Sequence, residues 1–105
     1  MSSIRWLLGC CIILPVAVFA DEGSDVYRQN CAVCHATGVH EVPEAPRLGV
    51  HIDWSSRLNT GRTGMLRSVL RGKGAMPPKG GNASLSDEQA EAALDYMLSR
   101  VGVKK

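Results

Sequence analysis

The C-terminal part of the chain carries the most regular pattern of hydrophobic and polar positions. Its apolar residues recur at three- and four-residue steps and form one continuous stripe: Ala90, Ala93, Leu94, Met97, Leu98 and Val101. This spacing is typical of an amphipathic helix that covers a core. Ser86 to Gln89 matches a capping box, and Gly102 stands where a C-terminal cap glycine belongs. The pattern therefore predicts a terminal helix that begins after Ser86 and ends before Gly102.

Shorter apolar stretches predict three further helices. The first is expected to run from residue 25 into the segment around Cys31, with Ser24 as its N-cap. The second is expected over 54–59, with Asp53 as its N-cap. The third is expected to begin at Thr63. In the last of these, Leu66, Val69 and Leu70 share a face. No segment shows a convincing strand pattern, so we expect an all-α chain.

Two segments without a sustained period predict irregular loops. Residues 37–52 hold two prolines and two glycines, and residues 72–81, "GKGAMPPKGG", hold paired prolines and four glycines. Paired prolines exclude a regular helix over the second segment. No internal repeat, low-complexity tract or linker indicates a second domain.

The first twenty residues have the pattern of a secretory signal peptide rather than of a folded element. Arg5 supplies a positive charge, residues 6–19 are almost wholly apolar, and Val18-Phe19-Ala20 places small or modest residues at the cleavage positions before Asp21. The apolar run is short for a membrane span. We expect a signal peptide over 1–20, a mature domain over 21–105 and a periplasmic location. Two alternatives stay open: an uncleaved signal that anchors the chain, and a lipid on Cys10.

Removal of the signal leaves a small domain with few means of stabilising itself. Cys31 and Cys34 are its only cysteines, and Tyr27, Trp54 and Tyr96 are its only aromatic residues. Domains of this size commonly need a disulfide, a metal or a cofactor. A disulfide between Cys31 and Cys34 would close a very short loop and constrain little of the unfolded chain.

The segment Cys31-Ala-Val-Cys34-His35 matches the attachment signature of c-type haem. Two cysteines on one helical turn can each form a thioether with a vinyl group of the same porphyrin, and the histidine that follows can ligate the iron. A thioredoxin-like dithiol would need an α/β fold, and a structural zinc site would need a full set of four ligands, which the sequence does not offer at short spacing. With an export signal in front of it, the motif predicts one haem c bound through Cys31 and Cys34.

Met76 is the expected second axial ligand, opposite His35. Met65 and Met97 lie on helical faces where packing explains them, and the two other histidines of the mature chain, His40 and His51, lie in a loop. Met76 is an apolar residue in a glycine- and proline-rich loop, followed by two prolines that stiffen it. The iron is thus predicted to be ligated by His35 and Met76.

Taken together, these motifs resemble a class I cytochrome c, most closely the short bacterial cytochrome c5 type. The likeness rests on "CAVCHATG", "APRLG" at 45–49, Trp54 with Arg57, "GKGAMPPKGG", and "LSD" before a terminal helix with "YM" at 96–97. It covers essentially the whole mature chain. The resemblance implies the small class I cytochrome c fold, with helices wrapped around one covalently attached haem and with the N- and C-terminal helices crossing.

The same resemblance implies roles for further residues. The carbonyl of Pro46 would accept the second ring proton of His35, Trp54 and Arg57 would contact the haem propionates, and the helix crossing would bring Tyr27 close to Tyr96. The chain also departs from its relatives. It lacks the extra cysteine pair that many of them carry after the methionine loop, and its loop "HEVPEA" at 40–45 is longer than usual.

Two protein ligands leave the iron no open position for a substrate, so we expect an electron carrier with no catalytic residues rather than an enzyme. Methionine sulfur and burial both favour Fe(II) and raise the reduction potential. Expected partners are redox proteins of a respiratory chain, such as a cytochrome bc complex, a terminal oxidase or a periplasmic reductase. Two alternatives remain: a haem subunit bound permanently to a larger complex, and a ligand-binding sensor or peroxidase from which Met76 dissociates.

The formal net charge of the chain is +2, and its basic residues cluster. No acidic residue lies between Asp53 and Asp87, whereas Arg57, Arg62, Arg67, Arg71, Lys73 and Lys79 all do. This run either steers acidic partners or forms solvated helix faces that also compensate the propionates. Nucleic acid is not an expected partner, because no aromatic residues alternate with these charges. Membrane contact is expected only through partners, and a weak homodimer stays open.

Overall fold

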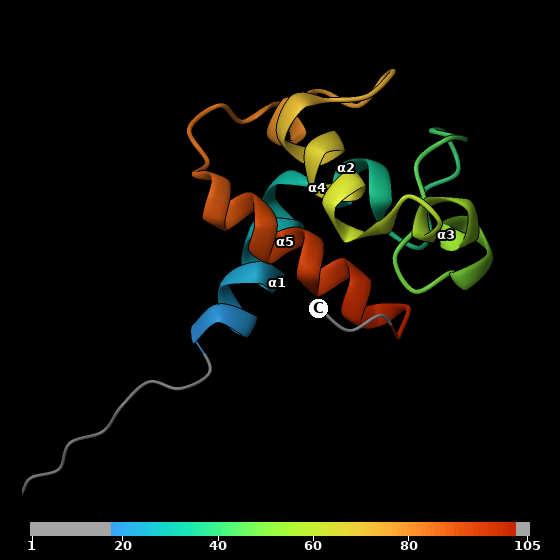
Figure 1. The fold of residues 1–105 in the computed structure, drawn as a ribbon, viewed down its shortest axis with the longest axis horizontal. Coiled ribbons are helices and arrows are strands. Elements are labelled where there is room, and N and C mark those ends of the chain that lie inside the picture. The colour runs from blue at the N-terminus through green and yellow to red at the C-terminus, as the bar shows by residue number, and fades with distance from the viewer. Residues whose placement is uncertain (1–17, 103–105) are drawn as a thin grey trace, which may run out of the picture.

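The computed structural model describes residues 18–102 of the 105-residue chain. Its elements are α1 (Val18–Asn30), α2 (Ala32–His35), α3 (His51–Leu58), α4 (Gly61–Arg71), the short 3-10 helix η2 (Pro78–Gly81) and α5 (Asp87–Arg100). These residues form no β-strand beyond one isolated bridge between Lys73 and Met76. In Figure 1, α5 lies across the middle of the molecule, with α1 beside it and α3 at the far end from α1. The all-α prediction is confirmed.

Helices α1 and α5 cross and make the most extensive contact between elements. Their backbones meet closely at Gly23, where an added Cβ would lie 2.4 Å from the carbonyl oxygen of Ala92. Near the crossing, the rings of Tyr27 and Tyr96 lie 5.3 Å apart between centroids. The expected approach of Tyr27 to Tyr96 is therefore present, and it brings the cysteine segment at the end of α1 over the core.

Helix α5 matches its prediction closely. Ser86 Oγ accepts the N–H of Gln89 at 3.0 Å, and the Gln89 side chain accepts the N–H of Ser86 at 2.9 Å, so the capping box is present. Gly102 has a φ of +84°, which favours glycine. The predicted stripe is buried from Ala90 to Leu98, while Val101 is half-buried. Helix α5 thus contributes one wall of the core, completed by Val26, Tyr27, Trp54, Met65 and Val69.

The predicted starts of the other helices are wrong. Helix α1 begins at Val18, and Ser24 lies inside it, where its hydroxyl accepts from Arg28 instead of capping. Helix α3 begins at His51, and Asp53 lies in its first turn, paired with Arg47. In both cases the side-chain oxygen that was predicted to cap the helix accepts a hydrogen bond from a nearby arginine. A capping residue is only a candidate start, because neighbouring side chains can bind the same oxygen.

Two smaller differences concern α4 and the loop that follows it. Helix α4 begins at Gly61 rather than Thr63. The segment 72–81 is predicted to contain no helix, yet Pro78–Gly81 forms η2. Inside η2, Lys79 and Gly80 have positive φ values of 54° and 64°, so this element is a tight turn rather than a continuing helix. Most of the segment is irregular, as expected.

Most of the expected signal peptide lies outside the described residues. Helix α1 includes residues 18–20, the last three of that segment, so the boundary after Ala20 stays a prediction. None of the described helices is long and apolar enough to cross a membrane.

Candidate functional site

The helices and loops line a large, mostly apolar cavity of about 460 Å³ that opens to the surface. Every residue that the sequence proposes for the site lines it: Cys31, Cys34, His35, Pro46, Trp54, Arg57 and Met76. Met65 and Val69 of α4 and Leu94 and Met97 of α5 also line it. Because these residues come from all parts of the chain, the fold itself assembles the site. Its volume lies in the range of small-molecule and cofactor pockets.

His35 is held in one orientation by its surroundings. The residue is 8% exposed, and its Nδ1 lies 2.7 Å from the carbonyl oxygen of Pro46. A carbonyl oxygen only accepts, so Nδ1 donates its proton and Nε2 keeps a free lone pair. The Leu48 N–H also donates to the His35 carbonyl at 2.7 Å, which ties the backbones together. The ring nitrogen that remains free is therefore the one available to a metal.

The charge state of His35 also suits a ligand. Burial lowers the pKa of His35, the hydrogen bond to Pro46 partly opposes this, and the positive charge of Arg57 lowers it further. The imidazole is thus neutral near pH 7, which is the form that binds iron.

Cys31 and Cys34 are free cysteines that share one turn. The N–H groups of Cys34 and His35 both donate to the Cys31 carbonyl, at 3.1 and 3.0 Å, and this compact turn follows directly from α1. Neither cysteine is in a disulfide. Burial, and then the neighbouring Cys34, raises the pKa of Cys31 to about 11. The turn therefore presents two thiols to the cavity from adjacent positions.

The loop that carries Met76 closes by a tight turn after α4. The N–H of Lys73 donates to the Met76 carbonyl at 3.0 Å, and the N–H of Met76 donates to the Lys73 carbonyl at 2.9 Å. Gly72, at φ +85°, lies so close to this turn that an added Cβ would stand 2.8 Å from the Met76 carbonyl oxygen. Met76 is half-buried and packs against the core. The turn thus holds the thioether at the cavity wall.

Trp54 and Arg57 of α3 form another part of the wall. Trp54 is 3% exposed, and its ring stacks on His35 with 6.4 Å between centroids. Its indole N–H donates to the Arg47 carbonyl at 2.9 Å. Arg57 donates to the carbonyl oxygens of Glu44 at 2.6 Å and Asp53 at 3.2 Å. Arg57 places a positive charge at the wall, while Trp54 contributes its ring.

Sequence reasoning missed Arg47, although it stands inside "APRLG" beside Pro46. Arg47 donates through Nε to the carboxylate of Asp53 at 2.7 Å, and its backbone N–H donates to the same carboxylate at 3.1 Å. These bonds lower the pKa of Asp53. The only sequence signal was an arginine and an aspartate at the two ends of a short loop, which is too common to be specific.

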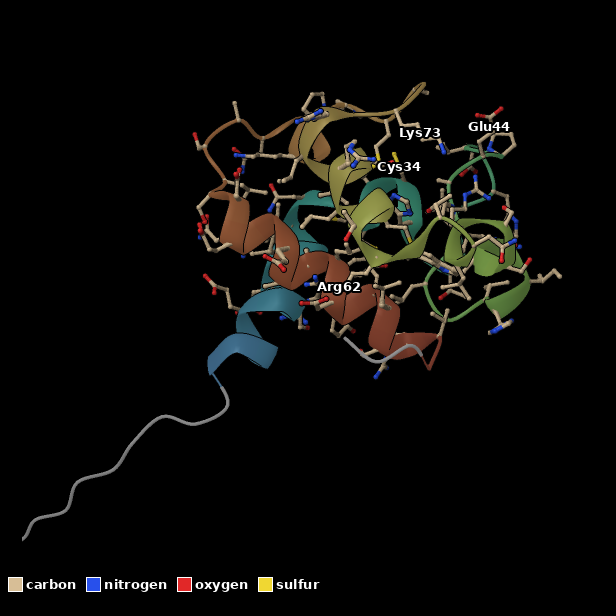
Figure 2. The ribbon with its side chains drawn as sticks, viewed as in Figure 1. Cys34, Glu44, Arg62 and Lys73 are labelled. Atoms are coloured by element: carbon tan, nitrogen blue, oxygen red, sulfur yellow. The ribbon has the colours of Figure 1, made fainter. Side chains whose placement is uncertain are left out.

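The longer loop at 40–45 runs along the cavity, since Val42, Glu44 and Ala45 all line it. Glu44 from this loop and Lys73 from the Met76 loop are both exposed cavity-lining residues, so they lie at its rim (Figure 2). Cys34 lies on the same side of the molecule in that view. The rim therefore carries a negative residue on one loop and a positive residue on the other.

The basic run separates into paired and unpaired residues. Arg62 bonds Asp95 at 2.8 Å and Glu91 at 2.5 Å, and Lys79 pairs with Asp87 at 2.9 Å. Three basic residues are exposed and have no ion pair among residues 18–102: Arg67, Arg71 and Lys73. Two of the six charges of the run therefore pair with carboxylates of α5, while three remain exposed and available to a partner.

The arrangement fits a haem better than a small ion. The cavity is wide and largely apolar, with two thiols, one imidazole nitrogen and one thioether at its wall. A structural zinc ion would need a compact cluster of ligands. Over the described part of the chain, no group of three or more His, Cys, Asp or Glu residues is placed to hold a metal ion.

Comparisons with known proteins agree with this geometry. The family model described as "Cytochrome C oxidase, cbb3-type, subunit III" matches residues 19–97. Cytochrome c-555 of Chlorobaculum tepidum is 34% identical over 90% of this chain and 91% of its own length. Cytochrome c5 of Azotobacter vinelandii is 39% identical over 74% of this chain and 93% of its own.

A solved structure is also similar. One chain of the crystal structure of an electron transfer complex of nitrite reductase with cytochrome c superposes with a TM-score of 0.64 and 41% identity, over 76% of this chain and 94% of that one. The chain therefore belongs to the c-type cytochromes. Within them it is a class I cytochrome of the short bacterial c5 type, and it is an electron carrier rather than an enzyme.

Proposed function

We propose that the chain is an exported one-electron carrier with one haem c, attached through Cys31 and Cys34 and ligated by His35 Nε2 and the Met76 sulfur. The observation that carries the proposal is the shared cavity. It gathers both thiols, the Met76 thioether and a histidine whose Nδ1 proton is already donated to Pro46.

When bound, the haem supplies an iron that alternates between Fe(II) and Fe(III). The residues of the chain do the rest. Pro46 and Trp54 keep the His35 ring in place, and the turn from Lys73 to Met76 presents a rigid thioether. Two fixed protein ligands and an apolar wall reduce reorganisation when an electron is transferred, and thioether ligation favours the reduced state.

Arg57 is proposed to contact the propionates, through its position in the cavity wall. Trp54 is proposed as a packing partner of the cofactor rather than a donor to it, because its N–H is taken by Arg47. Pro46 acts indirectly, through His35. These roles rest on geometry and on the family pattern.

The proposed location is the periplasm, reached through the signal at 1–20, and the proposed partners are redox proteins of a respiratory chain. A cytochrome bc complex, a terminal oxidase and a periplasmic reductase all suit this role. The exposed Arg67, Arg71 and Lys73 favour a partner with an acidic surface. The solved complex of a related cytochrome c with nitrite reductase supports a redox protein as the partner.

The test is the absorption spectrum of protein matured in a host with haem-attachment machinery. Met76→Ala should abolish the sulfur-to-iron charge-transfer band of the oxidised protein. Met65→Leu and Met97→Leu are matched controls, because they remove sulfurs that line the same cavity and are not proposed as ligands, and they should keep the band. A band that survives in Met76→Ala refutes the ligand assignment. The mass of the mature protein reports haem content and cleavage after Ala20 together.

A further inference from the structure

The loop that carries Met76 is fastened to the residue just before the cysteine motif. The side-chain amide of Asn82 donates to Asn30 Oδ1 at 2.9 Å, joining positions 52 residues apart, and both side chains are partly buried. We refer to this contact as the Asn30–Asn82 bridge. Asn30 ends α1 and directly precedes Cys31, while Asn82 directly follows η2.

We propose that the Asn30–Asn82 bridge is the positioning device that holds Met76 on the iron, and that its loss lets external ligands displace Met76. The inference rests on the His35 and Met76 ligation proposed above. Asn30 and Asn82 are positioning residues, since they act through the loop and not on the iron.

The two amides are oriented so that the bridge has one preferred polarity. Asn30 Nδ2 donates to the Val26 carbonyl at 3.1 Å, which turns its oxygen towards Asn82. Asn82 Oδ1 accepts the N–H of Ser84 at 3.0 Å, which turns its amide nitrogen towards Asn30. Each side chain is therefore fixed by a backbone group on its own segment before it makes the bridge. Such preorganisation reduces the entropy lost in holding two side chains together.

The loop backbone itself lies against Asn30. Gly80 has a φ of +64°, and a Cβ added there would stand 2.4 Å from the Asn30 carbonyl oxygen. Only a glycine allows this approach without movement of one segment. The bridge and the Gly80 contact together clamp the loop on the segment that carries Cys31.

The clamp lies close to Met76 along a stiff path. Pro77 and Pro78 follow Met76 directly, and their fixed φ angles limit how far the loop can move independently of η2. A clamp at Gly80 and Asn82 therefore restrains the sulfur as well. The position of Met76 is in this way fixed relative to the segment that carries Cys31.

A second tie holds the same loop and is weaker. Lys79 Nζ donates to the Leu85 carbonyl at 2.8 Å and pairs with Asp87 at 2.9 Å. The Asp87 side chain is 66% exposed, and exposed ion pairs contribute little. This tie also joins the loop to α5 rather than to the cysteine segment. The Asn30–Asn82 bridge is therefore the contact that fixes Met76 relative to the attachment site.

The experiment measures the affinity with which imidazole replaces Met76 in the oxidised holoprotein. Loss of the sulfur-to-iron charge-transfer band reports the replacement. Asn82→Asp is the sharpest variant, because it keeps the oxygen that accepts from Ser84 and replaces the donor to Asn30 by a second acceptor. We expect imidazole to bind about tenfold more tightly, which corresponds to about 1.4 kcal/mol, because the variant loses one partly buried hydrogen bond. Asn59→Asp makes the same chemical change at an exposed asparagine outside the cavity lining and should stay within about twofold of the parent.

A double-variant cycle tests the bridge itself. Asn30→Ala and Asn82→Ala should each tighten imidazole binding, and the double variant should do so no more than either alone, because both remove the same bond. Asn30→Ala removes the same hydrogen bond from the α1 side. Imidazole binding can therefore still be measured in this variant if the variants at Asn82 acquire haem poorly.

Three results overturn the inference. The first is unchanged imidazole binding in both Asn82→Asp and Asn30→Ala. The second is a lower thermal stability of these variants with no change in imidazole binding, which would give the bridge a structural role only. Fully additive effects in the cycle also contradict it. In each of these cases a band that is lost in Met76→Ala leaves the proposed function standing. A band that survives in Met76→Ala defeats the proposed function first.

Discussion

The carbonyl of Pro46, which accepts the proton of His35 Nδ1 over 2.7 Å, belongs to a segment that α3 holds in place. The next carbonyl, that of Arg47, accepts the indole N–H of Trp54 at 2.9 Å, and the Arg47 side chain binds Asp53. Trp54 and Asp53 both lie on α3. The orientation of the proposed iron ligand therefore depends on a helix that supplies none of the proposed ligands.

Trp54→Phe is expected to weaken this support while keeping an aromatic ring against His35. The variant leaves the partly buried Arg47 carbonyl without its donor, which costs about 1–3 kcal/mol. Denaturant unfolding of the holoprotein measures the loss. Unfolding at the parent midpoint would show that the hydrogen bond contributes nothing to the fold.

Asp53→Asn is expected to destabilise the protein near neutral pH and to matter less in acid. Hydrogen bonds from Arg47 lower the pKa of Asp53 in the folded state below its unfolded value of 3.8. The stabilisation is therefore complete above about pH 4 and is lost as the pH falls through the lowered folded-state pKa. The gap between the unfolding free energies of parent and variant, measured from pH 7 down to pH 2.5, should narrow towards the acid end. A difference in unfolding free energy that stays constant across that range would show that the Arg47–Asp53 ion pair is not the source of the stabilisation.

The sequence predicted the parts of this protein that local rules decide. The apolar stripe and capping box of α5 specify a helix and its two ends without help from elsewhere. The cysteine–histidine motif and the prolines after Met76 have a chemistry that few other functions share. For α5 and for the turn from Cys31 to His35, the short-range pattern and the final structure agree, whereas Pro78 begins η2, which the pattern did not predict.

The sequence did not predict contacts that depend on distant partners. Asp53 looks like a helix cap, but its carboxylate is bound by Arg47, which the preceding loop brings near. Asn30 and Asn82 carry no pattern at all, since an asparagine beside a turn is common, and only the crossing of segments reveals their bridge. The basic run likewise looks uniform, although α5 neutralises Arg62.

Gly23→Ala is expected to be destabilising even though alanine favours a helix. An added Cβ would lie 2.4 Å from the Ala92 carbonyl oxygen, so α1 and α5 would have to separate. Overpacking of this kind costs about 1–3 kcal/mol, more than the gain in helix propensity of up to about 1 kcal/mol. Thermal unfolding of the holoprotein tests it. Gly64→Ala is the matched control inside α4, where the nearest contact is the Thr60 side chain at 3.2 Å, and its midpoint should change less. An equal or higher midpoint in Gly23→Ala would mean that the helices do not pack this tightly.

The chain without haem is expected to be largely unfolded. A cavity of 460 Å³ lies between α4, α5 and the cysteine segment, and its walls include core residues such as Leu94 and Met97. At about 24 cal/mol per Å³, leaving so large a volume unfilled would cost up to about 11 kcal/mol, which is comparable to the whole stability of a small domain. The mouth of the cavity is open to water, so this figure is an upper bound, but collapse of the walls would break the contacts of α4 with α5 instead. A Cys31→Ala, Cys34→Ala double variant, prepared without haem, should therefore lose most of its far-ultraviolet circular dichroism signal and its cooperative thermal transition. A native-like helical spectrum in this variant would show that polypeptide packing alone holds the helices together and that the haem is not required for folding.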